Sequence, residues 1–266
     1  MLKSVLLESL HLYRELRALD EDMFSSAMED YPIYLRSMAD AFVNNPADLA
    51  VDERPGLTAY SDWAESYDQE TDNPVIAGED LVFNLVIDPL AKTTVLDVGA
   101  GTGRHAIPLA EGGSRVTAVE PNFEMLRRAK IKAETKKLDI EFLANNVYRP
   151  LAEAREFDLV LCCLVLSHVE DLGRAVSALA AHVNPGGCLL ISDFHPYNLL
   201  VGMRTSYCYN DTKYYVPNSV HMSSSYIRHA EESGLRLHAF HECGELNGYP
   251  DLPATLVLAF LRPGHC

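Results

Sequence analysis

A glycine-rich stretch directly after a short apolar run is the part of this sequence whose residues point most clearly to chemistry. The run is Val95–Val98, in which Asp97 is the charged residue, and it leads into Gly99, Gly101 and Gly103. Glycine permits positive φ angles and lets a ligand approach the backbone without a Cβ in the way. A buried strand that enters such a turn and continues into a helix predicts a nucleotide-like ligand at the carboxyl end of the strand.

The spacing of these glycines differs from the dinucleotide-binding pattern. G-x-G-x-x-G needs a glycine at position 104, where the chain has Arg104. NAD is therefore the less favoured cofactor. A second apolar run ends at Glu120, and a carboxylate there accepts hydrogen bonds from both hydroxyls of a ribose in dinucleotide-binding folds. Because Pro121 follows, Glu120 has an alternative role as a residue at a helix start, but beside the glycine turn ribose binding is favoured.

The elements that must position these residues alternate between strand and helix, which is typical of parallel βαβ units. The predicted strands are Thr94 to Val98, Arg115 to Val119, Ile140 to Leu143, Leu159 to Cys162 and Cys188 to Asp193. The predicted helices between them are Arg104 to Glu111, Phe123 to Lys136 and Leu172 to His182. A helix at Ser223 to Ser233 follows, and then two strands, Arg236 to Phe240 and Thr255 to Phe260, which we expect to form a hairpin-like closing pair.

Composition narrows the class of partner. The 266 residues include 38 acidic and 22 basic side chains, and the net charge of −16 repels nucleic-acid backbones. Apolar runs of about eighteen residues are absent, so no membrane span is expected. Charged residues interrupt the first sixteen positions, which argues against a signal peptide and for a cytoplasmic protein. The six cysteines lack metal-ligand spacing, and neither a metal site nor a disulfide framework is expected.

The N-terminal fifth has a different pattern. Apolar residues recur at three- and four-residue steps from Leu2 to about Ala18, and a second helical stretch is expected from Glu21 to Phe42. Asn44-Asn45-Pro46 interrupts this pattern. We therefore expect a helical lid or dimerisation segment over residues 1–57, a main domain over residues 58–266, and a monomer or homodimer.

Residues Asp97–Gly103 resemble motif I of the class I S-adenosylmethionine-dependent methyltransferases, an acidic residue and any residue followed by Gly-x-Gly-x-Gly. Phe157–Val160 resembles the fourth-strand motif of that family, Leu164–Val169 the stretch after it, and Asn184–Leu190 the turn into the fifth strand. Weaker similarity covers residues 63–68 and 226–234. The resemblance implies a Rossmann-like, doubly wound α/β fold with a seven-stranded, mostly parallel sheet, and S-adenosyl-L-methionine as the methyl donor.

The resemblance also implies a set of residues at the cofactor. Asp97 would meet the methionine amino group, Glu120 the ribose, Leu164 would border the methionine part, and one of Asn145 and Asn146 would meet the adenine. Arg104 and His105 are further candidates for the cofactor carboxylate. Tyr67 resembles a tyrosine that closes over the cofactor, and its alternative role is packing on the sheet edge. The full expected set is Tyr67, Asp97, Gly99, Gly101, Gly103, Glu120, Pro121, Asn145, Asn146 and Leu164.

Methyl transfer from a sulfonium is an in-line displacement, so the protein must align a nucleophile with the methyl group, and a base can remove its proton. The candidate bases are His168 after the fourth strand, His195 after the fifth, and His221, each with a structural role as the alternative. Asp193 either contacts the acceptor or ends a strand. The tyrosine-rich stretch Pro196–Pro217 lacks core periodicity and is expected to be a functional loop or lid.

The predicted function is methyl transfer to oxygen or nitrogen of a small molecule, with a specialised metabolite as the leading substrate class. Two alternatives come from other classes of protein. The first is a non-catalytic S-adenosylmethionine-binding partner or regulator. The second is a nicotinamide-dependent oxidoreductase, which Arg104 disfavours.

Overall fold

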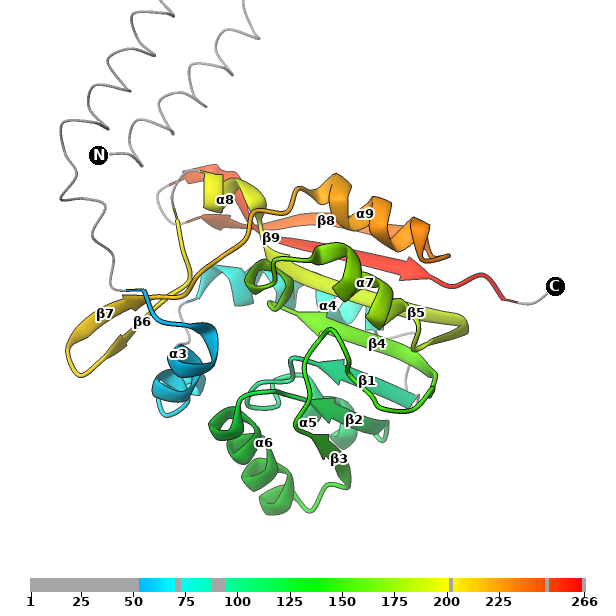
Figure 1. The fold of residues 1–266 in the computed structure, drawn as a ribbon, viewed down its shortest axis with the longest axis horizontal. Helices are drawn as coiled ribbons and strands as arrows, with labels where there is room; N and C mark the ends of the chain where they lie inside the picture. The colour runs from blue at the N-terminus through cyan, green and yellow to red at the C-terminus, as the bar shows by residue number, and fades with distance from the viewer. Residues whose placement is uncertain (1–52, 70–72, 88–93, 201–202, 247–248, 265–266) are drawn as a thin grey trace, which may run out of the picture.

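The computed structural model describes residues 53–69, 73–87, 94–200, 203–246 and 249–264. Figure 1 shows their arrangement. The helices expected between Leu2 and Phe42 lie outside these residues, and the division of the chain at residue 57 stays a prediction.

The centre of the fold is a seven-stranded sheet with the order β3-β2-β1-β4-β5-β9-β8 (Figure 1). Strands β1 to β5 pair in parallel, β9 is antiparallel to β5, and β8 is antiparallel to β9. The predicted doubly wound, mostly parallel sheet is therefore confirmed. The strands are β1 (Thr94–Val98), β2 (Arg115–Val119), β3 (Ile140–Leu143), β4 (Phe157–Cys163), β5 (Val183–Phe194), β8 (Arg236–Leu246) and β9 (Tyr249–Leu261).

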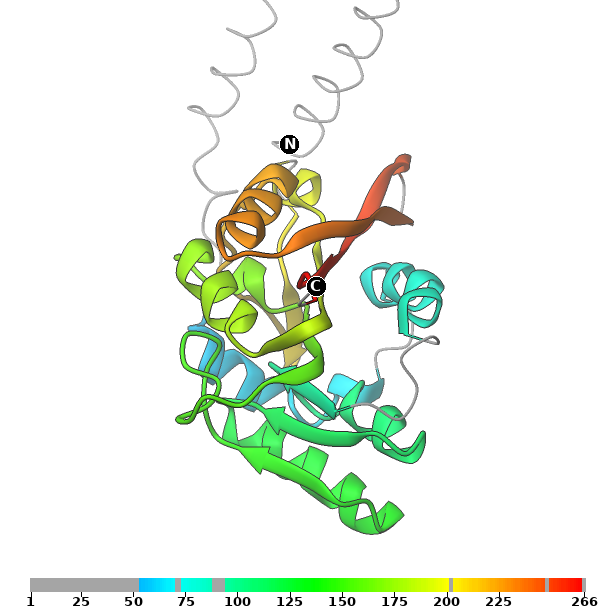
Figure 2. The ribbon, with the colours of Figure 1, turned by 90° about the vertical axis from the view of Figure 1, so that its right-hand side faces the viewer.

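Helices cover both faces of this sheet. Figure 2 shows α4 (Pro74–Ile87) on one side of it and α7 (Leu172–Ala180) and α9 (Ser223–Glu232) on the other. Successive strand residues point to opposite faces. Val95 accordingly packs in the cluster that includes α5 (Ala106–Glu111) and α6 (Phe123–Lys136), and Leu96 packs in the cluster that includes α7 and α9. Both faces are buried, which explains why the strands read as continuous apolar runs.

Most predicted boundaries agree with the structure to within a few residues. The predicted bounds of the first three strands and of α6 are those observed. Helix α6 starts at this point because the Asn122 side chain accepts hydrogen bonds from two first-turn amides, and it ends where Lys137 adopts a left-handed conformation. The closing antiparallel pair is also confirmed, although β8 and β9 are longer than predicted.

The stretch Pro196–Pro217, expected to be a functional loop or lid, has regular secondary structure, and its role as a lid stays a prediction. This stretch contains a short helix α8 (Pro196–Leu200) and the antiparallel hairpin of β6 (Ser206–Tyr209) and β7 (Thr212–Tyr215). Asn210 and Asp211 both have positive φ, 49° and 59°, as a two-residue hairpin turn requires. Tyr207 is 2% exposed and its ring lies 5.5 Å from that of Trp63. The hairpin therefore packs on the α3 helix (Gly56–Trp63), and the Asn-Asp turn was the signal for it.

Two expectations from composition concern the cysteines and the membrane. All five cysteines in the described part of the chain are free thiols, and Cys162, Cys163 and Cys188 are buried. None of the helices in the described ranges combines the length and the apolar character that crossing a membrane requires.

Candidate active site

The glycine turn after β1 has the backbone geometry that its sequence predicts. Gly99, Gly101 and Gly103 have φ angles of 78°, 55° and 87°. A Cβ on Gly99 would lie 2.2 Å from Val165 Cγ2, so glycine is needed there for the segment after β4 to approach. A Cβ on Gly101 would meet nothing within 4 Å, so the backbone at this position borders open space. The turn after β1 thus packs against the segment that follows β4 at Gly99, and its backbone at Gly101 is open to a ligand.

Glu120 connects this turn to the end of β2. Its Oε2 accepts a hydrogen bond from Gly101 N (2.9 Å), and its Oε1 accepts one from Asn122 N (2.8 Å). The side chain therefore also has the helix-start role named as its alternative. Burial, outweighing these hydrogen bonds, raises the pKa of Glu120 to about 7. Each carboxylate oxygen has a second lone pair that a ribose hydroxyl can use.

Asp97 and Arg104 each have a buried atom without a hydrogen bond. Asp97 is 2% exposed, and its Oδ2 has no partner among the described residues. Burial raises the pKa of this carboxyl group above its usual value. Arg104 Nη1 likewise makes no hydrogen bond within the described part of the chain, and it lies 3.7 Å from Asp80 Oδ1. A buried orphan acceptor near a buried orphan donor fits a ligand that carries both an ammonium and a carboxylate group, because such groups are costly to leave unpaired.

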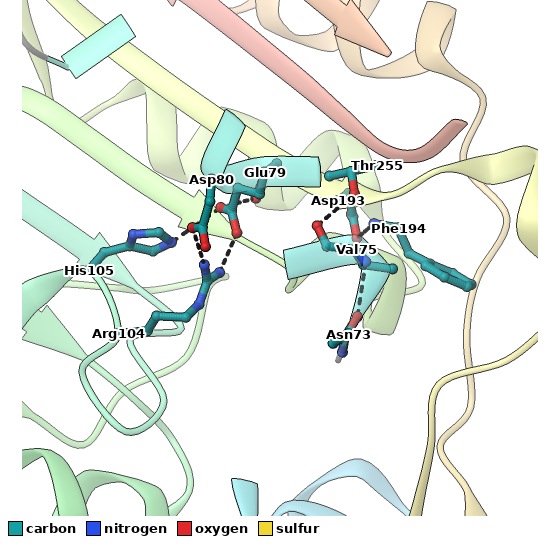
Figure 3. Close-up of polar contacts among 10 residues, drawn as sticks. Asn73, Val75, Glu79, Asp80, Arg104, His105, Asp193, Phe194 and Thr255 are labelled. Carbon is teal, nitrogen blue, oxygen red and sulfur yellow. Dashed lines mark hydrogen bonds and ion pairs between the residues drawn. The ribbon is translucent and has the colours of Figure 1, made fainter. Parts of the chain in front are cut away.

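Helix α4 supplies the counter-charge for Arg104. Figure 3 shows Arg104 and His105 pointing from the loop after β1 towards Glu79 of α4. Glu79 is fully buried, pairs with the Arg104 guanidinium, lies 3.2 Å from His105 Nε2, and accepts a hydrogen bond from Ser192 Oγ (2.6 Å). Burial opposes ionisation, but the hydrogen bond and charge of His105 and the charge of Arg104 outweigh it and lower the pKa of Glu79 to about 2. This ion pair fixes α4 against the glycine turn.

Glu79, His105 and Cys163 also place three possible metal-ligand atoms within 4.8 Å of one another. The carboxylate is already neutralised by Arg104, and burial raises the pKa of the Cys163 thiol well above its usual value. The cluster in this structure is therefore an ion pair beside a neutral thiol, and we assign no metal to it.

A cavity of about 480 Å³ opens beside the glycine turn. Its aromatic side is formed by Tyr60 and Trp63, whose rings stack 5.7 Å apart, and by Tyr67, whose ring lies 5.0 Å from that of Trp63. Leu164, next to the Val165 that contacts Gly99, also lines the cavity and has a φ of 59°. Positive φ in a leucine is strained, and such strain gathers at functional sites. The remaining lining residues are Gln69, Asn73, Pro74, Val75, Ile76, Ser167, His168, Phe194, Met203, Arg204, Thr205 and Ser206.

His168 is the candidate base that lies at this cavity. Its Nδ1 lies 3.0 Å from the carbonyl oxygen of Pro217, which can only accept, so Nδ1 carries the proton. Nε2 is then the acceptor in the neutral ring, and the Tyr60 hydroxyl donates to it over 3.0 Å. Burial lowers the pKa of His168, so the imidazole is neutral near pH 7. The ring is thus held with its basic nitrogen towards Tyr60.

The other two histidines lie elsewhere. His195 is fully buried, with Nε2 2.9 Å from Glu242 Oε1 on β8 and Nδ1 accepting from Tyr197 N (3.2 Å). His221 Nε2 lies 2.7 Å from the carbonyl oxygen of Val169, and its ring lines a separate surface depression beside α7 and α9. The structure therefore does not bring His195 or His221 to the cavity that His168 lines.

Asp193 is buried at the end of β5, behind the cavity wall. It accepts hydrogen bonds from the Tyr226 hydroxyl and from Phe194 N, both at 2.8 Å, and burial raises its pKa. These contacts favour the structural role over direct contact with an acceptor.

The remaining predicted cofactor residues surround the turn. Tyr67 lies in the short helix η2 (Tyr67–Gln69). This helix contacts the glycine turn through Asp68, whose Oδ1 accepts a hydrogen bond from Thr102 Oγ1 (2.6 Å). Pro121 is exposed at the end of β2. Asn146 uses its Oδ1 to accept from Tyr148 N, whereas Asn145 donates its Nδ2 to the carbonyl oxygen of Pro150. The Asn145 oxygen is thus the better candidate for an adenine contact.

Sequence reasoning missed two residues of the site, Tyr60 and Glu79. Glu79 could have been found as an acidic residue within the apolar run Pro74–Ile87, where proline at the first position also indicates a helix start. Tyr60 had no such signal, because its partner His168 is 108 positions away in the chain.

Known proteins resemble this arrangement in both sequence and fold. Residues 96–191 match the family model described as a methyltransferase domain. The match covers the central segment of the chain. The resemblance to class I methyltransferases is thereby confirmed for the segment that holds the glycine turn, Glu120 and Leu164.

Two curated relatives that this chain matches are named ubiquinone biosynthesis O-methyltransferase. The protein from Coxiella burnetii (strain RSA 331 / Henzerling II) is 33% identical over 153 residues, which are 54% of this chain and 63% of that protein. The protein from Methylobacterium sp. (strain 4-46) is 36% identical over 100 residues, 38% of this chain and 40% of that protein. The chain thus covers less than two thirds of the length of either relative.

Solved structures share the fold of the domain. An S-adenosylmethionine-dependent methyltransferase from Clostridium acetobutylicum has a TM-score of 0.58 at 16% identity, covering 85% of this chain and 98% of that one. Magnesium protoporphyrin IX methyltransferase from Synechocystis PCC 6803, crystallised with bound SAM, has a TM-score of 0.52 at 20% identity, covering 69% and 77%.

Proposed function

We propose that this protein is an S-adenosylmethionine-dependent methyltransferase that acts on oxygen or nitrogen of a small molecule. The observation that carries the proposal is the open glycine turn, flanked by the orphan Asp97 Oδ2 on one side and the Glu120 carboxylate on the other, directly beside an aromatic cavity. In doubly wound folds this edge of the sheet is where ligands bind.

The donor site accounts for each part of S-adenosylmethionine. Asp97 Oδ2 accepts from the methionine ammonium group, and Arg104 Nη1 donates to the methionine carboxylate, which satisfies both orphan atoms. Glu120 accepts from the ribose hydroxyls, and Asn145 from the adenine amino group. Glu79 holds Arg104 in place through their buried ion pair. Bound in this way, the sulfonium would present its methyl group to the cavity beyond Leu164.

The acceptor site is the aromatic cavity, and its size matches a small molecule. The net charge of −16 disfavours nucleic-acid acceptors. The names of the two ubiquinone biosynthesis O-methyltransferases support oxygen as the methylated atom. His168 is the proposed base, since it lines the cavity with a neutral ring. We retain a specialised metabolite as the proposed substrate class.

Calorimetric titration with S-adenosylhomocysteine, the demethylated donor, tests this proposal first. We expect the wild-type protein to bind S-adenosylhomocysteine, and Asp97→Asn and Glu120→Gln each to weaken this binding. The control is Glu111→Gln, which changes an exposed carboxylate at the end of α5 and should leave the affinity unchanged. Transfer of a labelled methyl group to a panel of phenols, amines and carboxylic acids then tests catalysis.

The outcomes separate the proposal from its rivals. Absence of binding would refute it, and binding of NAD instead would favour an oxidoreductase. Tight binding of S-adenosylhomocysteine without transfer to any member of the panel would favour the non-catalytic partner.

A further inference from the structure

We propose that Tyr60 and His168 form a proton relay for an aromatic hydroxyl acceptor, with Tyr60 as the residue that contacts the acceptor. This inference rests on the proposed function and adds to it a catalytic residue and a substrate class. The observations that carry it are the Tyr60–His168 hydrogen bond, the carbonyl group behind the imidazole, and the aromatic rings that surround both.

The hydrogen-bond geometry makes Tyr60 the intermediate between the cavity and the base. With the proton on Nδ1 held by the Pro217 carbonyl oxygen, Nε2 has the single lone pair of the neutral ring, and the Tyr60 hydroxyl occupies it at 3.0 Å. Asn218 Nδ2, at 3.4 Å from Nδ1, is a donor and does not compete for that proton. Because this lone pair is occupied, an acceptor in the cavity that Tyr60 and His168 both line reaches His168 through the Tyr60 hydroxyl.

The relay moves one proton for each methyl group. The acceptor hydroxyl donates to Tyr60 Oη while Tyr60 passes its own proton to His168 Nε2. The acceptor oxygen forms a bond to the methyl carbon, the carbon–sulfur bond breaks, and sulfur keeps the electron pair. Burial raises the pKa of Tyr60 well above its usual value, so the phenol remains neutral before and after the step. The imidazolium then returns the proton to water when product leaves the cavity.

The charged and titratable groups around His168 suit this role. Tyr60 faces it from α3, and Asp193 faces it from the end of β5, where a carboxylate charge favours the imidazolium form. The Pro217 carbonyl oxygen accepts from Nδ1 in both protonation states. Burial works in the opposite direction and keeps the resting ring neutral.

The cavity walls indicate an aromatic ring as the part of the acceptor that binds. Tyr60 and Trp63 stack with an interplanar angle of 19°, Tyr67 meets Trp63 edge-on, and Phe194 and Met203 are among the other apolar lining residues. Flat aromatic ligands gain from offset or edge contacts with such rings. A hydroxyl on the ring would then lie within reach of Tyr60.

Two acceptors of different acidity test the relay. Phenol is un-ionised at pH 8, whereas 4-nitrophenol is largely an anion and needs no base. The variants are Tyr60→Phe, which keeps the stacked ring, and His168→Asn, which keeps a donor for the Pro217 carbonyl. The control is Tyr207→Phe, which removes a hydroxyl on the other side of Trp63 that contacts Asp62 rather than His168.

We expect Tyr60→Phe and His168→Asn each to lower the turnover of phenol by about 100-fold, a typical contribution of general base catalysis. Their double variant should fall no further, because residues that act as a unit are non-additive. The loss with 4-nitrophenol should be within about threefold, since its proton is already absent. Affinity for S-adenosylhomocysteine should stay unchanged in both variants and in the control.

Three results would overturn the relay. The first is full phenol turnover by Tyr60→Phe, and the second is an equal loss of turnover with phenol and with 4-nitrophenol. The third is a wild-type protein that binds S-adenosylhomocysteine and methylates amines or carboxylic acids but methylates no phenol. Failure of the wild-type protein to bind S-adenosylhomocysteine would instead refute the proposed function. Trp63 is the single tryptophan of the chain and lines the cavity, so its fluorescence reports whether each variant still binds the acceptor.

Discussion

The protonation of Glu120 should make donor binding depend on pH in a defined direction. The pKa of Glu120 in the free protein is raised to about 7 by burial. Ribose hydroxyls donate hydrogen bonds, so they require the ionised carboxylate. Below pH 7 the carboxyl group takes up a proton that it must release on binding, and affinity then falls about tenfold per pH unit. Above pH 7 the affinity should level off, because the group is already ionised.

The size of the effect follows from that pKa. Between pH 8 and pH 6 the dissociation constant for S-adenosylhomocysteine should rise about tenfold, since a group with a pKa near 7 is mostly ionised at the first pH and mostly protonated at the second. Glu120→Gln should weaken binding at pH 8 by about 2 kcal/mol, or about 30-fold, the value of a hydrogen bond to a charged group. The variant should also lose most of the pH dependence.

Isothermal titration calorimetry at pH 6, 7 and 8 measures both effects. Glu111→Gln serves as the control, because Glu111 is exposed and pairs with Lys136. Burial lowers the pKa of His168, which is also an ionisable group near the cavity, and Glu120→Gln separates any contribution of that imidazole from that of the carboxylate. A wild-type affinity that is constant from pH 6 to pH 8, or an equal pH dependence in the variant, would refute the assignment of Glu120.

Three further predictions concern the turn and its supports. Asp97→Asn should weaken binding of S-adenosylhomocysteine in calorimetry by about 1–3 kcal/mol, the cost of a lost charged hydrogen bond. Methylthioadenosine lacks the amino acid part of the ligand, so the variant should bind it with unchanged affinity. Gly99→Ala should lower the free energy of unfolding by about 2–4 kcal/mol in denaturant titrations, because its Cβ would clash with Val165 at a positive φ; a fully stable variant would contradict this. Glu79→Gln should cost about 3–5 kcal/mol by removing the buried carboxylate that pairs with Arg104. Since the folded pKa of Glu79 is lowered to about 2, the wild-type protein should lose this stabilisation as the pH falls from about 4.5 towards 2, and the variant should lack that loss.

The sequence alone determined the elements whose pattern is local. Strands buried on both faces appear as apolar runs, and the turn after β1 needs glycines because its backbone has positive φ. For that reason the first three strands, α6 and the sheet class could be predicted, whereas the roles of Asp97 and Glu120 at the cofactor stay predictions. The hairpin of β6 and β7 was missed because its strands have four residues each, too few for a periodic pattern.

The tertiary structure decided which residues meet. In the sequence His168 and His195, near the ends of strands, were favoured over His221, near the start of a helix, but the sequence did not separate the first two. Packing turns His195 towards Glu242 and places His168 against Tyr60, 108 positions away. Such contacts depend on how helices α3 and α4 lie on the sheet, and local periodicity does not encode that arrangement. The sequence therefore determined the glycine turn, and the fold placed His168 rather than His195 or His221 at the cavity.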